Sequence, residues 1–600
     1  MMPSAPLLAS DADAAVLGVA RSLCGRRWLL RPADECLTRV LAETLDVPPL
    51  IARMLAARGV GADVAADFCA PTLRRLLPDP RRLRDMPTAA ERVAAAVRAG
   101  ETIAIFGDYD VDGATSSALL VRFLRSLGAE PSVYIPDRIR EGYGPNARAM
   151  RALAAAGARL VITVDCGTSA HEALAEAQAA GLDVIVVDHH EVGRTLPPST
   201  ALINPNRDDD ASGQGHLAAV GVAFLLVVEV NRRLREEGFF RSRPEPDLRQ
   251  WLDLVALGTA CDMVPLTGVN RAFVSQGLKI MAQGANAGIR ALAELIDLRH
   301  PPGAFELGFM FGPRVNAGGR VGEAGMGARL LSTEDAAEAR ALAVHLDGFN
   351  RERQRIEAGV LAAALEQVEG EASMSGAWLT VAEGEGWHPG VIGIVASRLV
   401  ERFAKPAIVV ALDEVRGVGS GRSVPGRDLG AAVHAAIEAG LLIKGGGHPM
   451  AAGFSLARDR LGEFAAFLDE RLKAAAGAEA PPFYLDGVLG LVGGVPALHA
   501  GLERLCPFGS DNPEPRFAIS DVHIVSAATV GQGHLRLALA DPEGSRLEAI
   551  AFRCQGTALG SALSAHAGRA FHLAGRLQAK VWQGARRLQL LVEDAAPARA

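Results

Sequence analysis

The chain has 600 residues, of which 49% are hydrophobic and 22% are charged, and its formal net charge is −7. This length exceeds what one hydrophobic core supports and predicts three or four domains, while the charge balance excludes a surface coated throughout with basic residues for nucleic acid. A local basic groove is still compatible with this net charge. Seven scattered cysteines without a C-x-x-C pair argue against a disulfide framework or a structural zinc. Residues 1–25 lack the apolar core of a signal peptide and nothing resembles a spanning segment, so we expect a cytoplasmic protein.

The first half of the chain is predicted to contain a parallel sheet. Residues 1–100 have the pattern of short helices with a basic connector, ending in an amphipathic helix over Thr88–Ala99. From Glu101 to Arg207 apolar strands alternate with helices, which is typical of βαβ units. The predicted strands cover 102–106, 132–135, 160–164 and 184–187, and the predicted helices cover 115–127, 146–156 and 171–180.

The second half is predicted to contain two further folded regions. A helical stretch over 217–296 leads to one long charged helix, Glu334–Glu369, which would bridge two lobes. A second α/β lobe follows at 377–475, with strands at 377–381 and 407–410, and residues 474–482 resemble a linker. Short alternating strands at 534–539, 547–552, 571–577 and 587–592 then indicate a small β-barrel.

Three carboxylates follow the first predicted strand. Asp108, Asp110 and Asp112 alternate in Phe106-Gly-Asp-Tyr-Asp-Val-Asp-Gly113, and in an extended segment such residues share one face. Like charges this close are costly unless cations neutralise them. Gly113 would permit a sharp turn, and Thr115 would cap the next helix so that its N-terminus favours a phosphate. The alternative is an acidic turn that merely follows a strand.

Acidic or imidazole side chains lie beside apolar runs at three more places: Asp165 after 161–164, Asp188-His189-His190 after 184–187, and Asp262 before a proline-ended segment. Taken singly, each has an ordinary structural explanation as a helix cap, a core histidine or a helix end. Together they point to one site, because the carboxyl ends of parallel strands are where open sheets place ligands. Asp188 could orient an imidazole without itself binding metal.

The chemistry of this set indicates a divalent-metal phosphoesterase. Aspartate oxygens with one or two imidazoles suit Mn²⁺ or Mg²⁺ better than a structural Zn²⁺. Two such ions about 4 Å apart would clamp the attacking and leaving oxygens of a phosphoryl displacement and generate hydroxide from water.

These motifs occur in the order seen in the DHH phosphoesterase superfamily, and Gly445–Gly453 resembles the signature of its DHHA1 lobe. Within the superfamily the chain most resembles the RecJ family of exonucleases, over about residues 45 to 595. The pieces that carry this closer resemblance are 312–320, 350–354, 386–398 and 507–515. Gly318 and Asp511 depart from the family's pattern, and neither is a proposed metal ligand.

The resemblance implies the fold and the ligand set. It implies an α/β protein with an N-terminal helical segment (1–70), a DHH parallel-sheet catalytic domain (71–332), a linking helix (333–372), a DHHA1 α/β domain (373–476) and an OB-fold nucleic-acid-binding barrel (483–597). It further implies that two Mn²⁺ or Mg²⁺ ions are held by Asp110, Asp112, Asp165, His189 and Asp262, with Asp108 beside them. His190 would face the scissile phosphate.

Candidate substrate contacts lie in three places. Glycines around Arg314, Asn316 and Arg320 allow close backbone approach to a phosphate. In the second lobe, the glycine-rich turns and their neighbours would capture a terminal phosphate, and the resemblance favours this interpretation; the residues are His388, Arg398, Arg422, Ser423 and His448. In the barrel, cationic and aromatic side chains suit a platform for a single strand, with barrel core or ordinary surface as an equal alternative; they are His534, Arg536, Phe552, Arg553 and Trp582.

The predicted function is a single-stranded-DNA-specific 5′-to-3′ exonuclease that releases 5′-mononucleotides in recombination and repair. The single-stranded-DNA-binding protein and a helicase would be its partners. Polarity and strand specificity come from the resemblance alone. One alternative is a DHH phosphodiesterase for short oligonucleotides or cyclic dinucleotides, which would not need the helical region and the barrel. Another is a binding protein with a decayed nuclease site, against which the complete ligand set argues.

Overall fold

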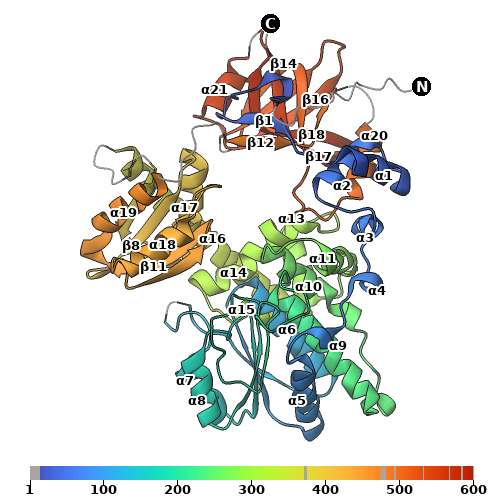
Figure 1. The fold of residues 1–600 in the computed structure, drawn as a ribbon, viewed down its shortest axis with the longest axis vertical. Helices are drawn as coiled ribbons and strands as arrows, with labels where there is room; N and C mark the ends of the chain where they lie inside the picture. Colours follow the sequence, from blue (N-terminus) through green and yellow to red (C-terminus); the bar gives the residue numbers. More distant parts are fainter. Residues whose placement is uncertain are drawn as a thin grey trace. The chain divides into compact units, whose positions relative to one another are not determined.

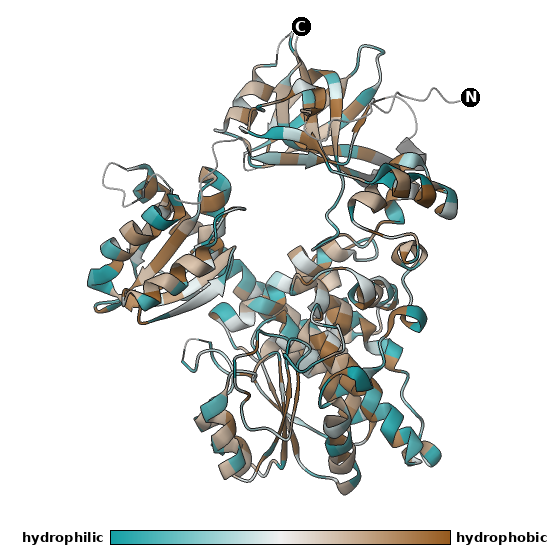
Figure 2. Ribbon diagram, in the orientation of Figure 1, coloured by the Kyte–Doolittle hydropathy of each residue, from teal (hydrophilic) through white to brown (hydrophobic). Residues whose placement is uncertain are grey.

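A parallel five-stranded sheet has the strand order β3-β2-β4-β5-β6. It lies in the part of the chain drawn from blue to teal in Figure 1. The strands are β2 (Ile103–Gly107), β3 (Ser132–Tyr134), β4 (Leu160–Val164), β5 (Asp183–Val187) and β6 (Ala201–Ile203). Strands β2 and β4 are buried along their whole length, as expected when helices cover both faces, and Figure 2 colours them as hydrophobic. The α/β fold and four of these strands are confirmed. Strand β6, only three residues long, was not predicted.

Helices pack on both faces of this sheet. Side chains of α7 and α8, including Met150 and Leu174, pack with Val161 and Val186 on one face. Helices α5, α6 and α9 contact the sheet strands as well. The bounds are α5 (Met86–Ala99), α6 (Val111–Ser126), α7 (Ala147–Ala155), α8 (His171–Ala179) and α9 (Ala219–Glu236).

A mostly helical stretch follows the sheet, as predicted. Its helices are α10 (Leu252–Cys261), α11 (Gly268–Met281), α12 (Ala287–Leu295), α13 (Ala304–Glu306), the π-helix η5 (Leu307–Phe311), α14 (Gly312–Val321) and α15 (Met326–Ser332). Short 3₁₀ turns lie at η2 (Pro80–Arg82), η3 (Phe239–Arg241) and η4 (Leu248–Trp251).

The long helix α16 (Ala336–Glu369) bridges two lobes, as its sequence predicts. Its N-cap is Asp335, whose carboxylate accepts from the amide of Ala337. The first half of α16 contacts α12, α14 and α15, and the second half packs Val360 and Ala364 into the core of the second lobe.

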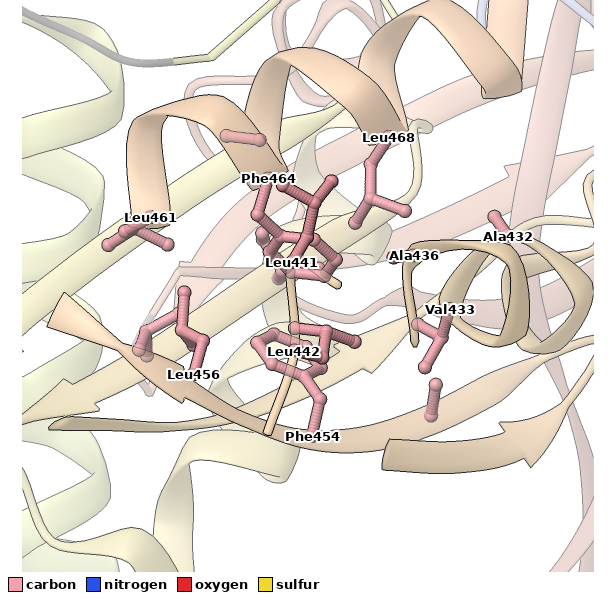
Figure 3. Packing of buried hydrophobic residues seen from close by; sticks show 14 of the residues in the cluster. Ala432, Val433, Ala436, Leu441, Leu442, Phe454, Leu456, Leu461, Phe464 and Leu468 are labelled. Carbon is pink, nitrogen blue, oxygen red and sulfur yellow. The ribbon is translucent and has the colours of Figure 1, made fainter. Parts of the chain in front are cut away.

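The second lobe is an α/β layer with strand order β10-β11-β9-β8-β7, in which only β7 and β8 are parallel. The bounds are β7 (Thr380–Glu385), α17 (Pro389–Phe403), β8 (Ala407–Leu412), β9 (Arg416–Arg422), α18 (Leu429–Glu438), β10 (Lys444–His448), β11 (Ala451–Ala457), η6 (Arg458–Arg460) and α19 (Leu461–Lys473). Figure 3 shows Phe464 and Leu468 of α19 packed with Phe454 and Leu441. Strand β7 begins three residues later than predicted, where Thr380 donates to the carbonyl of Pro406 beside β8.

The C-terminal region contains a closed barrel. Strands β14, β15, β16, β18 and β17 follow one another, and the β14–β17 pairing closes the ring. The bounds are β12 (Pro482–Leu485), β13 (Gly487–Leu489), α20 (Val495–Glu503), β14 (Arg516–Val530), β15 (His534–Ala540), β16 (Arg546–Ala551), α21 (Ala558–Ser564), β17 (Ala570–Trp582) and β18 (Ala585–Pro597). The four predicted strands are confirmed, and β14 was not predicted.

The N-terminal region contains a strand that the sequence did not predict. Strand β1 pairs with β12 in parallel, and the buried Trp28 donates its indole N–H to Asp594 Oδ2 at 3.0 Å. The elements are η1 (Val16–Gly18), β1 (Arg27–Leu30), α1 (Glu35–Leu45), α2 (Pro49–Ala57), α3 (Ala65–Cys69) and α4 (Leu73–Leu76). At four residues, β1 is too short for an alternation pattern to reveal it.

The computed structural model describes residues 14–138, 140–370, 375–376, 378–473, 481–491, 495–531, 533–566, 568–582 and 585–598. Ala377, where a strand was predicted to start, and the linker residues 474–480 lie outside these ranges. Within these ranges no helix is long and apolar enough to cross a membrane. By internal contacts the chain divides into two units, 1–78 with 263–276 and 479–600, and 79–262 with 277–478. The finer division into five segments stays a prediction.

Candidate active site

Four polar residues stand in a row at the carboxyl edge of the parallel sheet. The register aligns Gly107, Val164, Val187 and Ile203 across β2, β4, β5 and β6. The next residue of each strand is therefore the first to leave the sheet, and these residues are Asp108, Asp165, Asp188 and Asn204. All four are at most 4% exposed. The sheet itself brings these side chains together.

Helix α6 adds two more carboxylates. Asp110 is its N-cap, and Oδ1 accepts from the amide of Gly113 at 3.1 Å. Asp112 lies in the first turn, where its two oxygens accept from the amides of Ala219 and Val220 at 2.6 and 2.9 Å. These amides belong to the first turn of α9, whose partial positive charge suits a carboxylate.

Two local predictions for this motif were wrong. The segment from Asp108 to Asp112 is not one extended strand, because α6 already begins at Val111. Thr115 is consequently inside the helix, where its hydroxyl donates to the carbonyl of Val111, and the cap is Asp110. Gly113 is required for close approach rather than for a turn, since a β-carbon there would lie 2.5 Å from the Asp108 carbonyl oxygen.

The two histidines have different surroundings. Nε2 of His189 lies 3.3 Å from Asp165 Oδ1, 3.7 Å from Asp262 Oδ2 and 3.9 Å from Asp112 Oδ2. His190 turns its Nδ1 to Asp188 Oδ1 at 2.8 Å, and its side chain is 47% exposed. His189 therefore lies among the carboxylates, whereas His190 faces outward.

Seven side chains form what we call the acidic cluster. Three overlapping groups have ligand atoms within 4.8 Å of one another: Asp108 with Asp110 and Asp165; Asp112 with His189 and Asp262; and Asp165 with His189 and His190. Asp262, the C-cap of α10, reaches the cluster from outside the sheet. Among the described residues, Asp108 Oδ1 and Asp262 Oδ2 are buried without a hydrogen-bond partner. Such oxygens are costly to bury unless a cation binds them.

Four carboxyl groups of the cluster, those of Asp108, Asp112, Asp165 and Asp262, have raised pKa values. Burial, with the charge of Asp110 nearby, raises the pKa of Asp108 to about 8 and that of Asp262 to about 7. Burial and neighbouring aspartates also raise the pKa values of Asp112 and Asp165 well above the usual range. A multivalent cation would relieve this repulsion.

Asp188 and His190 behave in the opposite sense. Burial disfavours ionised Asp188, but its bonds from His190 and Thr168 outweigh that cost, so its pKa lies below the usual range. The same bond raises the pKa of His190 in spite of burial. The protonated form of the imidazole is thereby favoured beside the carboxylates. Asp188 is not a member of the cluster's ligand groups, in keeping with the predicted orienting role.

Sequence reasoning missed three residues that position the histidines. Asn204 donates to the carbonyl of His190 at 2.9 Å and to Thr168, and Asn206 donates to the carbonyl of His189 at 2.5 Å. The hydroxyl of Tyr143 contacts the carbonyl oxygen of Asp165 and the ring of His190. An asparagine after the short apolar run of β6 was the available signal, whereas Tyr143 lies in a loop without one.

Of the predicted substrate contacts near the catalytic sheet, two are already paired. Arg314 donates to Asp347 and to the Met310 carbonyl, and Arg320 donates to the Gly390 carbonyl at 3.1 Å. Among the described residues, Asn316 Oδ1 is buried without a partner. Burial, with Arg138 and Arg353, lowers the pKa of Arg320 to about 10, so this guanidinium would gain from an anion.

In the second lobe the register brings some candidates together and separates others. His448 pairs with Ala451, which in turn pairs with Arg422, so these residues end three adjacent strands at what we call the glycine-rich edge. His388 instead caps α17, which follows the C-terminal end of β7. The glycine-rich edge is aligned with the N-terminal end of β7, through the register of Arg422 with Ala407 and of Ala407 with Thr380. Arg398 is paired with Glu401, and the buried Ser423 donates to the Arg427 carbonyl.

The structure describes the side chains of some of the barrel candidates. The rings of His534 and Phe552 meet edge to face with their centroids 5.1 Å apart, and Phe552 is 54% exposed. Nδ1 of His534 accepts from the amide of Arg553. Arg536 is exposed on β15. Trp582 ends β17, and its side chain lies outside the described part of the chain.

Comparison with known proteins agrees with this geometry. Residues 102–259 match the DHH family N-terminal domain, 373–474 the DHHA1 domain and 485–594 the RecJ OB domain. The single-stranded-DNA-specific exonuclease RecJ of Dickeya dadantii is 39% identical over 572 residues, covering 92% of this chain and 96% of the relative. Two crystal structures of RecJ from Thermus thermophilus each cover 96% of this chain. The Mn²⁺ complex has a TM-score of 0.79 and 32% sequence identity, and the match covers 80% of its chain. The Mg²⁺ complex has a TM-score of 0.73 and 31% sequence identity, and the match covers 78% of its chain. The chain belongs to the RecJ family of single-stranded-DNA-specific exonucleases.

Proposed function

We propose that this chain is a metal-dependent exonuclease that digests single-stranded DNA from the 5′ end and releases 5′-mononucleotides. The convergence of the acidic cluster at the carboxyl edge of the sheet carries this proposal. Membership of the RecJ family, whose relatives are named single-stranded-DNA-specific exonucleases, supports the substrate class. The role would be in recombination and repair.

The cluster fits two divalent cations. Its donors are carboxylate oxygens with imidazole nitrogens, the ligand set of Mn²⁺ and Mg²⁺, and two of those oxygens lack protein partners among the described residues. The residues that would hold the ions are Asp108, Asp110, Asp112, Asp165, His189 and Asp262. When bound, the cations would supply the charge neutralisation and Lewis acidity that phosphodiester hydrolysis needs.

The protein's own residues would orient the scissile phosphate. His190 is half-exposed, and its contact with Asp188 raises the pKa of the imidazole, so its ring is suited to donate a hydrogen bond to a phosphate oxygen. Asn204 and Asn206 fix the backbone of both histidines, which keeps that imidazole at one position relative to the carboxylates. This arrangement would stabilise negative charge that develops during hydrolysis.

The first turn of α17 is suited to hold a terminal 5′-phosphate. Nη2 of Arg422 lies 3.2 Å from the position that a β-carbon of Gly393 would occupy, and Arg320 donates to the Gly390 carbonyl. Two buried or half-buried guanidiniums thus border the start of a 15-residue helix, whose N-terminus favours anions. Capture of the end in this way would account for digestion from the 5′ terminus.

The single strand has to be supplied by other proteins. We propose that a helicase unpairs the duplex and that the single-stranded-DNA-binding protein keeps the product available, in the cytoplasm where the DNA lies. The barrel's exposed Phe552, with Arg536, would hold the strand by stacking and charge.

The test uses a long single strand labelled at its 5′ end and incubated with Mn²⁺. The wild type should release labelled mononucleotide from the first moments, while Asp110→Ala should release none and Asp459→Ala, an exposed aspartate on η6, should match the wild type. Label that stays on a shortening strand would mean the opposite polarity. A long strand left intact while a dinucleotide is cleaved would favour the short-oligonucleotide phosphodiesterase instead.

A further inference from the structure

Two phenylalanines are exposed side by side beside the acidic cluster. Phe305 on α13 is 58% exposed and Phe309 on the π-helix η5 is 71% exposed. Their rings stack with centroids 4.9 Å apart and planes 25° from parallel. Single exposed apolar residues are ordinary, but a stacked aromatic pair kept in solvent indicates a binding surface.

The helix that carries this pair is fixed to the active site. Cys261, which directly precedes Asp262, donates its thiol to the Leu307 carbonyl at 3.3 Å. A β-carbon on Gly312 would lie 2.7 Å from that same sulfur, so η5 is packed tightly against the end of α10. Further along the same helical run, a β-carbon on Gly319 would lie 2.6 Å from the Tyr109 carbonyl, between Asp108 and Asp110. The run from Leu307 to Val321 therefore borders the cluster at both ends.

The spacing along the helical run sets the direction of the two rings. Phe305 and Phe309 are four residues apart and lie on one face of the run, while Leu307 and Phe311 are fully buried. Because the Phe309 side chain is largely exposed, a flat group can reach its ring from solvent. π-Helical turns occur frequently at functional sites.

We propose that Phe305 and Phe309 form a stacking platform for a nucleobase of the single strand whose 5′ end lies in the active site. A phenyl ring has no hydrogen-bonding group, so it accepts any base, which suits an enzyme that digests without regard to sequence. Stacking also requires an unpaired base, so the platform would contribute to the preference for single strands. The proposal rests on the proposed function, since it needs the strand to pass the acidic cluster.

The experiment measures binding and digestion by the full chain. Phe309→Ala and Phe305→Ala should weaken binding of a single strand in EDTA, followed by fluorescence anisotropy, about 5- to 100-fold. In Mn²⁺ they should raise KM more than they lower kcat, and Phe309→Trp should restore binding where Phe309→Leu does not. Val344→Ala, which removes an exposed apolar side chain from α16, is the matched control and should equal the wild type.

Abasic substrates separate stacking from a merely structural role. A single abasic nucleotide is moved along the strand from the 5′ end, and the wild type should show weakened binding at one position. Phe309→Ala should lose that position-specific penalty, because the missing base has no ring left to contact. Equal penalties in wild type and variant, or unchanged binding by the variants, would overturn the proposal and leave a protein partner as the occupant. If the wild type itself digests nothing, the proposed function has failed instead.

Discussion

The carboxyl edge of the catalytic sheet and the glycine-rich edge of the second lobe, to both of which the sequence assigned phosphate chemistry, are built in opposite ways. At the carboxyl edge the row formed by Asp108, Asp165 and Asp188 is almost wholly buried, and several carboxylates of the cluster lie close together. At the glycine-rich edge every residue of β10 is exposed and the His448 side chain is 72% exposed. Buried like charges favour a tightly held resident cation, whereas exposed side chains make weak contacts with a phosphate that salt screens. One edge is suited to keep its ligand and the other to release it after each cycle.

We expect the largest effect on activity from a substitution that removes a charge from the buried carboxyl edge. Asp112→Asn keeps the size and shape of the side chain but removes one negative charge from the cluster, and its one amide oxygen can accept from only one of the amides of Ala219 and Val220. We expect digestion to fall at least about 10³-fold, because a metal ion's stabilisation of charge is worth several kcal/mol. Mn²⁺ titration followed by calorimetry should show weakened binding. Full activity in this variant would remove Asp112 from the proposed ligands.

A second prediction concerns the support of the buried edge. Asn204→Ala removes the bonds to the His190 carbonyl and to Thr168 without touching a proposed ligand. Residues that orient metal ligands are typically worth 10- to 100-fold, so we expect activity and Mn²⁺ affinity to fall by about that factor. Asn286→Ala, a buried asparagine that caps α12, controls for general destabilisation. A loss of thermal stability with unchanged Mn²⁺ affinity in Asn204→Ala would contradict the positioning role.

A third prediction concerns the second lobe. Arg422→Ala should raise KM about tenfold with little change in kcat, since a charge-assisted phosphate contact contributes to binding. The loss should be smaller for strands that carry a 5′-hydroxyl, and it should shrink as salt rises. Arg402→Ala, at the far end of α17 and paired with Glu369, is the matched control. Equal losses on both kinds of 5′ end would show that Arg422 does not contact the terminal phosphate.

The smallest expected effect is a pH-dependent change in the Tm shift that Mn²⁺ causes. The pKa values of Asp108 and Asp262 are raised to about 8 and about 7 in the fold, above their usual value near 4 in the unfolded chain, so the fold loses stability as pH rises from about 4 to about 8. Mn²⁺ removes this cost only where the carboxylates are ionised. We therefore expect Mn²⁺ to raise Tm by several degrees more at about pH 8 than at about pH 5.5. Asp108→Asn should raise Tm without metal at about pH 8, and an equal Mn²⁺ shift at both pH values would contradict the assignment.

Much of the fold and of the acidic cluster was predictable because buried strands have a recognisable local sequence pattern. The runs before Asp108, Asp165 and Asp188 are β-branched and apolar, so both the strands and their polar ends were visible in the sequence. Helix α6 was predicted four residues too late, because the cap was assigned to Thr115 rather than to Asp110. Hydroxyl and carboxylate caps give similar local signals.

What could not be predicted depends on distant contacts. Tyr143 reaches the site through a loop, and Asn204 matters only because β6 is placed beside β5. The Phe305–Phe309 pair likewise has no signal, since two phenylalanines four apart normally indicate a buried helix face. The pair is exposed because Leu307, which accepts from Cys261, and Phe311 take the buried side of the helical run.

The pairing of β1 with β12 has a consequence for how the chain is made. Arg27–Leu30 leaves the ribosome early, and its partner Pro482–Leu485 emerges only about 450 residues later. At a synthesis rate of about 5–20 residues per second, tens of seconds pass between the synthesis of Trp28 and that of Asp594, which accepts its indole N–H. During that interval the apolar strand is a candidate for chaperone binding or mispairing. A fragment that starts at the barrel, or ends before it, would leave one side of this pair exposed.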